Sequence, residues 1–162
     1  MYEGAGGKGG RRGFLRWAAA AGGLLGLGRL ARAHHTETHF GETTAHKLVY
    51  QLNKADPAYI GSILFSVGEM LRKYGDDIEL VVTVIGPGLH LLAKEPGRPI
   101  PPELRQRAAS LAQYGVAFHA CGNTLKALGW TADDLVDFAR VVPIGADDLM
   151  RLQERGFAYI SW

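Results

Sequence analysis

The sequence of 162 residues contains one cysteine, Cys121, which excludes a fold held together by internal disulfides. It lacks the glycine spacing of a P-loop and of a dinucleotide-binding turn, so neither nucleotide-binding motif is present. No internal repeat is visible, which excludes a repeat architecture. With no second cysteine to pair with, the sulfur of Cys121 is either a buried apolar side chain or a group that reacts with other molecules.

Residues 1–33 are predicted to be a twin-arginine (Tat) signal peptide. Arg11 and Arg12 precede an apolar run from Trp17 to Leu27, and Ala31-Arg32-Ala33 ends it with small residues at the two positions that a signal peptidase recognises. The alternative is a membrane anchor, but this run is interrupted by glycines and is shorter than the ~20 residues that cross a bilayer. We expect cleavage after Ala33, a periplasmic or otherwise extracytoplasmic protein, and no stable membrane insertion after cleavage.

Removal of the signal peptide changes the charge balance of the protein. Six of the 18 Lys and Arg residues and one of the 16 Asp and Glu residues lie in residues 1–33, so the remaining 129 residues carry a net charge of −3. No basic stripe with interleaved aromatic side chains remains, and a nucleic-acid partner is therefore not expected. The length suits one domain with a single core.

Residues 34–45 are predicted to be a flexible, histidine-containing leader, because they are polar and follow neither the helical nor the strand period. Cleavage leaves His34 as the N-terminus, with His35 and His39 nearby, and a free amine beside imidazole rings can bind copper, nickel or zinc. Histidines at flexible chain ends also bind metals adventitiously. These three are the only candidate metal ligands, and the sequence predicts no cofactor.

Strands and helices are predicted to alternate through residues 46–162. Strands are predicted from apolar and β-branched runs at residues 46–52, 78–85, 115–120, 141–144 and 157–162. Helices are predicted at residues 57–74, 103–114, 124–128 and 146–155, with one more short helix after Thr131. This alternation predicts an α/β fold: a three-layer α/β/α sandwich around a largely parallel sheet of about five strands, with right-handed crossovers.

Cys121 lies where a short strand is predicted to lead into a helix. If Gly122, Asn123 and Thr124 open that helix, their backbone amides face the sulfur and stabilise a thiolate or a persulfide anion. Asn123 and Thr124 are also each a candidate N-cap of the helix. A buried structural cysteine is the alternative, but the carboxyl edge of an open α/β sheet is where such proteins bind ligands.

Other residues are candidates to complete a site at Cys121. His119 lies two residues earlier, on the same face of an extended strand, and is a candidate to assist thiolate formation; the alternative is a hydrogen-bonded core histidine. Gly86 and Gly88 are candidates for a wall of the site, although Gly-Pro-Gly is first of all a turn. Three acidic pairs are interpreted as helix caps and dipole partners rather than as catalytic carboxylates: Asp76-Asp77, Asp133-Asp134 and Asp147-Asp148.

Three segments resemble the DsrE/DsrF-like family, the sulfur-relay fold that includes the Tus and Dsr proteins. They are Gly86-Pro87-Gly88-Leu89, Gly115-Val116 through Cys121-Gly122-Asn123-Thr124-Leu125, and Val142-Pro143-Ile144-Gly145 through Leu152 to Ile160. The resemblance covers residues 46–162 and implies the family's fold and a homo-oligomer, a trimer or hexamer. In relay members a cysteine after a central strand accepts a sulfane sulfur as a persulfide, and Cys121 matches it. Those members are cytoplasmic, so an export signal departs from the family pattern.

We therefore expect an exported sulfur-handling protein, a candidate sulfurtransferase or sulfur carrier, in which Cys121 accepts and transfers sulfane sulfur. Its partners would be sulfur donor and acceptor proteins or small sulfur compounds. One alternative is a non-catalytic oligomeric module that binds a small anion or a metal and in which Cys121 is structural. Another is a thiol redox sensor, which an oxidising compartment favours.

Overall fold

The computed structural model describes residues 44–162. The predicted signal peptide and nearly all of the predicted leader lie outside these residues. The strands are β1 (His46–Leu52), β2 (Ile78–Val84), β3 (Ala117–Cys121), β4 (Ala139–Val142) and β5 (Ala158–Ile160). The helices are α1 (Pro57–Tyr74), α2 (Pro102–Gln113), α3 (Gly122–Leu128) and α4 (Gly145–Glu154), with short 3-10 helices η1 (Gly75–Asp77), η2 (Gly86–Leu92) and η3 (Ala132–Asp134).

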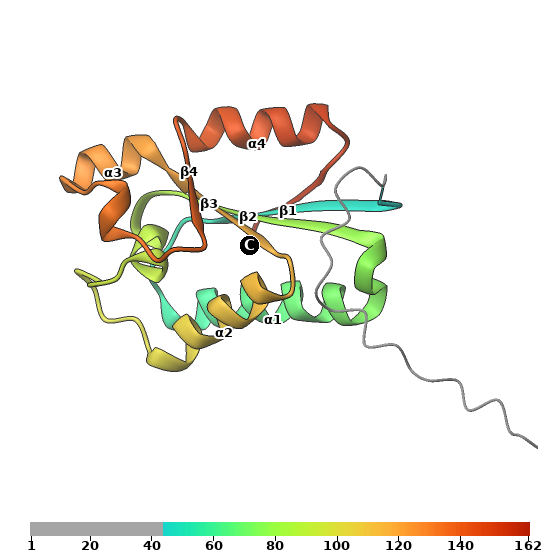
Figure 1. The fold of residues 1–162 in the computed structure, drawn as a ribbon, viewed down its shortest axis with the longest axis horizontal. Coiled ribbons are helices and arrows are strands. Elements are labelled where there is room, and N and C mark those ends of the chain that lie inside the picture. The colour runs from blue at the N-terminus through green and yellow to red at the C-terminus, as the bar shows by residue number, and fades with distance from the viewer. Residues whose placement is uncertain (1–43) are drawn as a thin grey trace, which may run out of the picture. The chain divides into compact units, whose positions relative to one another are not determined.

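Within residues 44–162, five strands form one parallel sheet in the order β4-β3-β2-β1-β5. Each of the first three strands pairs with the next strand along the chain, and after β4 the chain returns to the far side of β1 to form β5. Helices α1 and α2 cover one face of the sheet and α4 covers the other (Figure 1). The predicted three-layer α/β/α sandwich with a parallel sheet of five strands is therefore confirmed.

The alternation of side chains along the strands divides the core into two layers. Val49 and Val81 face α4, where they form a small cluster with Leu149, Leu152 and Phe157. Their neighbours along β1 and β2 point to the opposite face, because successive strand side chains alternate. There they pack in a larger cluster against the apolar residues of α1 and α2. Burial of each large apolar side chain contributes about 1.5–3 kcal/mol, so this larger layer supplies most of the hydrophobic stabilisation.

The predicted start of the first helix is confirmed. The Asp56 carboxylate caps α1 by accepting a hydrogen bond from the backbone N–H of Tyr59 at 2.8 Å, and Pro57 occupies the first helical position. The helix ends at Gly75, whose φ of 58° suits a residue without a Cβ. The residues at the two ends of α1 therefore predicted where the helix begins and where it ends.

Several boundaries differ from the sequence prediction by one or two residues; for example, β3 is Ala117–Cys121 rather than residues 115–120, and α3 begins at Gly122 rather than at residue 124. Strand β4 is Ala139–Val142 rather than residues 141–144, because Pro143 has no N–H for the strand ladder and α4 already begins at Gly145. The Gly-Pro-Gly segment, interpreted from sequence as a turn, is the start of the 3-10 helix η2. In the part of the chain that the structure describes, no helix is long and apolar enough to cross a membrane.

Candidate functional site

Cys121 is the last residue of β3 and the N-cap of α3. The turn from strand to helix is tight because Gly122 packs against the end of β4. A Cβ at Gly122 would lie 3.0 Å from the carbonyl oxygens of Val142 and Pro143, so a larger residue would push the two strand ends apart. The predicted position of Cys121, between a strand and a helix at the carboxyl edge of the sheet, is confirmed.

A second helix also begins at the sulfur. The backbone N–H of Gly145, the first residue of α4, donates a hydrogen bond to Cys121 Sγ over 3.2 Å. A Cβ at Gly145 would lie 2.9 Å from Ile85 Cγ1 and 3.1 Å from Cys121 Cβ, so only glycine allows this approach. The sequence analysis did not include Gly145 among the site residues, although a glycine that opens a helix after Pro-Ile was a visible signal.

These contacts control the ionisation of the thiol. Burial by itself raises the pKa of Cys121, but the hydroxyl and backbone N–H of Thr124 and the amide of Gly145 outweigh it. The amide of Asn123 acts in the same direction, and the pKa of Cys121 lies below that of an ordinary cysteine. The arrangement therefore favours a thiolate, the form that attacks sulfur.

Asn123 and Thr124 are not N-caps, because α3 begins at Gly122 and Cys121 itself takes the capping position. Both residues lie in the first turn, where their amides act on the sulfur as predicted. The Thr124 hydroxyl also accepts a hydrogen bond of 2.9 Å from the backbone N–H of Gly86. Thr124 thus connects the end of β2 to the cysteine.

His119 lies on the same face of β3 as Cys121, as the strand period predicted, since both residues contact α4. Its Nδ1 donates to the Asp148 carboxylate at 2.8 Å, and the same oxygen accepts a bond of 2.8 Å from the Thr83 hydroxyl. The hydrogen-bond partner of His119 is thus Asp148 rather than the thiol, which is the core-histidine alternative. Asp148 lies in the first turn of α4, as expected for a dipole partner, and its carboxylate also holds α4 against β2 and β3.

The hydrogen bonds from His119 and Thr83 determine the ionisation of Asp148. Burial raises the pKa of the carboxyl, but the hydrogen bonds from His119 and Thr83 more than compensate, and the pKa lies below its usual value. Asp148 is therefore ionised at neutral pH and accepts both bonds. Since α4 carries both Asp148 and Gly145, the same network helps to keep the Gly145 amide at the sulfur.

A cavity of about 460 Å³ lies next to Cys121, which is itself only 4% exposed. Its walls come from the ends of β2 and β3 and the starts of α3 and α4: Ile85, Gly86, Pro87, His90, Arg98, Cys121, Asn123, Thr124, Ala127, Leu128, Ile144, Gly145 and Ala146. Gly86 is thus part of the wall, as predicted. Gly88 is not among the lining residues, because it packs against Leu52, whose carbonyl oxygen would lie 2.5 Å from a Cβ there.

Two lining residues, His90 and Arg98, were missed by the sequence analysis. His90 is buried, its ring packs edge-on against Trp130, and its Nδ1 accepts a hydrogen bond of 3.1 Å from the backbone N–H of Gly97. Burial, and next the charge of Arg98, hold the pKa of His90 below its usual value, so the ring is neutral at pH 7 with its proton on Nε2. No periodic pattern in the sequence indicated either residue.

No group of three or more His, Cys, Asp or Glu side chains within residues 44–162 is placed to hold a metal ion. The candidate metal ligands His34, His35 and His39 lie outside the described residues.

The model of the DsrE/DsrF-like family matches residues 46–162. No curated protein sequence matches the chain. Among ten matching chains of solved structures is a protein of unknown function from Methanobacterium thermoautotrophicum. It is 26% identical, with a TM-score of 0.65, and the alignment covers 72% of this chain and 99% of that one.

Proposed function

This chain belongs to the DsrE/DsrF-like family, and we propose that it handles sulfur through Cys121, which accepts a sulfane sulfur as a persulfide and passes it to an acceptor thiol. The family match suggests sulfur relay at the level of the family. The proposal assigns the chemistry to the single cysteine of this chain.

The observation that carries the proposal is the hydrogen bond from the Gly145 amide to Cys121 Sγ at 3.2 Å. An amide donor at the start of a helix stabilises an anion on sulfur, whether that anion is a thiolate or a persulfide. The lowered pKa of Cys121 follows from this contact together with those of Thr124 and Asn123. The adjoining cavity of about 460 Å³ provides room for an added sulfur atom and for the molecule that delivers it.

The proposed reaction consists of two exchanges that need no oxidant. The Cys121 thiolate attacks the outer sulfur of a donor R–S–SH, a Cys121 S–S bond forms, the donor S–S bond breaks, and R–S⁻ leaves with the electron pair. The outer sulfur keeps its proton, which leaves Cys121 as a persulfide. An acceptor thiolate then attacks the same outer sulfur and carries it away, and Cys121 returns to the thiolate.

The test is the intact mass of the protein after incubation with polysulfide or thiosulfate. We expect added sulfur that a reductant removes. Cys121→Ser is expected to keep the fold and to lose all reductant-labile sulfur, because a hydroxyl fills the space but cannot carry a persulfide. Uptake of sulfur by the serine variant, or a native thiol that reacts only after unfolding, contradicts the proposal.

The burial of Cys121 favours a second candidate function. A thiol that is 4% exposed suits a non-catalytic module in which the cysteine is structural and the cavity binds a small anion. This alternative predicts that the folded protein takes up no sulfur and that Cys121→Ser leaves anion binding unchanged. The mass experiment therefore separates the two functions.

We further propose that the protein acts outside the cytoplasm, on the strength of Arg11-Arg12 and the Ala31-Arg32-Ala33 cleavage pattern. When both arginines are replaced by lysine, the precursor is expected to stay inside the cell, because the twin-arginine export pathway recognises that pair of arginines. The measurement is cell fractionation followed by N-terminal sequencing, which should begin at His34 in the exported form. Arg29→Lys, outside the pair, is the matched control, and normal export of the double variant contradicts the assignment.

A further inference from the structure

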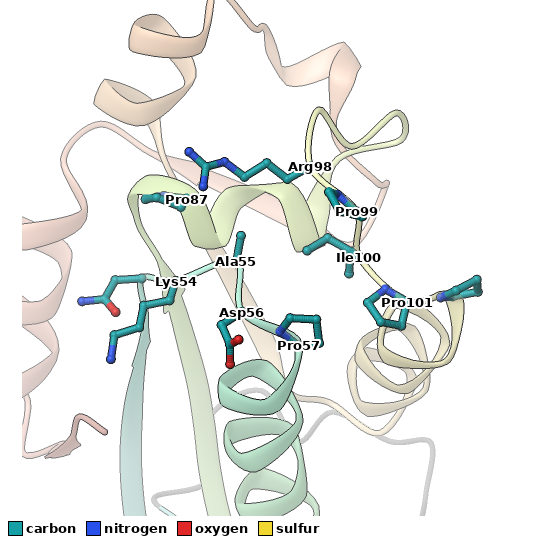
Figure 2. A pocket seen from close by; sticks show the side chains of 11 residues that line it. Lys54, Ala55, Asp56, Pro57, Pro87, Arg98, Pro99, Ile100 and Pro101 are labelled. Atoms are coloured by element: carbon teal, nitrogen blue, oxygen red, sulfur yellow. The ribbon is translucent and has the colours of Figure 1, made fainter.

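A second, larger cavity lies beside the one at Cys121. It has a volume of about 900 Å³ and is walled mostly by small and apolar groups, among them five prolines: Pro57, Pro87, Pro99, Pro101 and Pro102. Figure 2 shows its walls, with Pro57 at the start of α1, Pro101 beside the start of α2, and Ile100 between them. Each proline fixes its own φ angle, which limits the conformations open to the backbone around this cavity.

The two cavities share Pro87 and Arg98 as lining residues. Figure 2 shows the Arg98 side chain extending from its loop toward Pro87, the other residue that lines both cavities. Together they form one cleft along the carboxyl edge of the sheet, with Cys121 at one end and the prolines at the other. Open α/β sheets bind their ligands at this edge.

The charges in the proline end of the cleft favour an anion. Arg98 and Lys54 line it, and Arg98 forms no ion pair with any residue from 44 to 162. The only lining carboxylate is that of Asp56, which is already occupied as the cap of α1. Helices α1 and α2 both begin at this cavity, so the positive ends of their dipoles add to the two cations.

From this geometry we infer that the sulfur donor is a small organic persulfide that carries a carboxylate, an inference that rests on the proposed function. Its persulfide end occupies the cavity at Cys121, its carboxylate binds Arg98 at the junction, and the rest of the molecule lies in the proline cavity. Two observations favour an organic molecule. An inorganic anion would leave the proline cavity empty, whereas the two volumes suit an organic ligand. A thiol that is 4% exposed is also out of reach of a flat protein surface.

The reaction on this donor is the first exchange described above. The Cys121 thiolate attacks the outer sulfur, the donor S–S bond breaks, and the organic part leaves as R–S⁻. That leaving thiolate is a second anion in the cleft, which Arg98 lines on both sides of the junction. Arg98 therefore has two expected effects, tighter binding of the carboxylate and faster departure of the thiolate.

The experiment compares two donors of opposite charge, glutathione persulfide with its carboxylates and cysteamine persulfide with its ammonium group. Sulfur uptake is followed by mass, and its second-order rate constant is measured for each donor. Arg98→Gln is expected to lower the rate with glutathione persulfide about tenfold, the loss of one charge-assisted contact, and to lower the rate with cysteamine persulfide much less. Arg98→Lys should restore part of the rate. Lys73→Gln, the same charge change near the far end of α1, should leave both rates unchanged.

A second measurement tests binding in the cleft independently of sulfur transfer. S-methylglutathione cannot transfer sulfur, and its binding to the native protein by calorimetry should weaken about tenfold in Arg98→Gln. No binding to the native protein, or equal effects of Arg98→Gln on both persulfide donors, overturns this inference even if Cys121 takes up sulfur. Binding of S-methylglutathione without sulfur uptake from any donor keeps the cleft as an anion site and instead contradicts the proposed function.

Discussion

Two opposing effects act on the sulfur of Cys121. Burial disfavours the thiolate, since a charge is less stable away from water. Hydrogen-bond donors favour it, and here they come from Thr124 and Asn123 at the start of one helix and from Gly145 at the start of another. The donors prevail, so the pKa lies below the ordinary value. The structure therefore combines a thiol that is 4% exposed with contacts that favour its thiolate.

Thr124→Val tests the contribution of the hydroxyl to this balance. The rate of alkylation of Cys121 at neutral pH should fall about fivefold, the effect of losing one hydrogen bond worth about 1 kcal/mol. Because the pKa rises toward the ~8.5 of a free thiol, a smaller fraction of Cys121 is thiolate at pH 7. The measurement is the alkylation rate as a function of pH.

The control for this prediction is Thr131→Val. This variant also removes a threonine hydroxyl, one that takes part in the capping box of η3. Its free energy of unfolding should fall, but the pH midpoint of Cys121 alkylation should stay at the native value. An unchanged midpoint in Thr124→Val, or a native midpoint at or above that of a free thiol, would show that the hydroxyl does not activate Cys121.

Helix α4 is the element that connects the site to the rest of the sheet. Its first residue, Gly145, donates to the sulfur, and its Asp148 carboxylate binds both His119 on β3 and Thr83 on β2. On the same helix, Leu149 and Leu152 pack against the sheet. The position of the Gly145 amide is therefore determined by polar and apolar contacts further along the helix, and not by the Pro-Ile turn alone.

Gly145→Ala tests this element. The added Cβ would lie 2.9 Å from Ile85 Cγ1, so the start of α4 must move away from the sulfur. We expect a loss of about 1–3 kcal/mol in the free energy of unfolding, as in other overpacked sites, together with slower alkylation of Cys121 at neutral pH. Urea denaturation and alkylation kinetics measure the two effects.

Gly68→Ala provides the matched control, because a Cβ there has no neighbour closer than 3.9 Å and lies within α1. This variant should be stabilised by roughly 0.5–1 kcal/mol, with no change in thiol reactivity. If Gly145→Ala alkylates as fast as the native protein, the helix amide is not what activates the cysteine.

At the scale of the whole domain, parallel pairing brings distant segments to one edge. The ends of β1, β2, β3 and β4 all lie at the carboxyl edge of the sheet, and the loops that follow them form the cleft. Residues 53–57, 85–90, 98–102, 121–128 and 144–146 meet there. The cleft is thus a property of the sheet order and not of any one segment.

The protein is expected to assemble as a trimer or hexamer, a prediction that rests on its family resemblance. Light scattering at micromolar concentration measures the mass of the particle, and a monomer would count decisively against the assembly. Cys121→Ser should assemble equally well, because the cysteine lies in the site and is 4% exposed. Loss of the oligomer in that variant would instead support the redox-sensor alternative, in which Cys121 pairs across subunits.

The sequence alone determined the local features of this protein. The apolar and β-branched runs predicted each strand to within a few residues, Asp56-Pro57 predicted the start of α1, and the two-residue strand period placed His119 on the face of Cys121. These features arise from interactions between neighbours along the chain, so they can be read from spacing. The carboxyl-edge position of Cys121 followed in the same way.

The tertiary structure alone decided which distant groups meet. It placed β5 beside β1, brought Gly145 to a sulfur 24 residues away, paired His119 with Asp148, and set Arg98 between two cavities. Such contacts depend on which strands pair and on how a helix packs across the sheet. Many sequences with the same spacing would allow other pairings, and only the packing of the whole core selects this one.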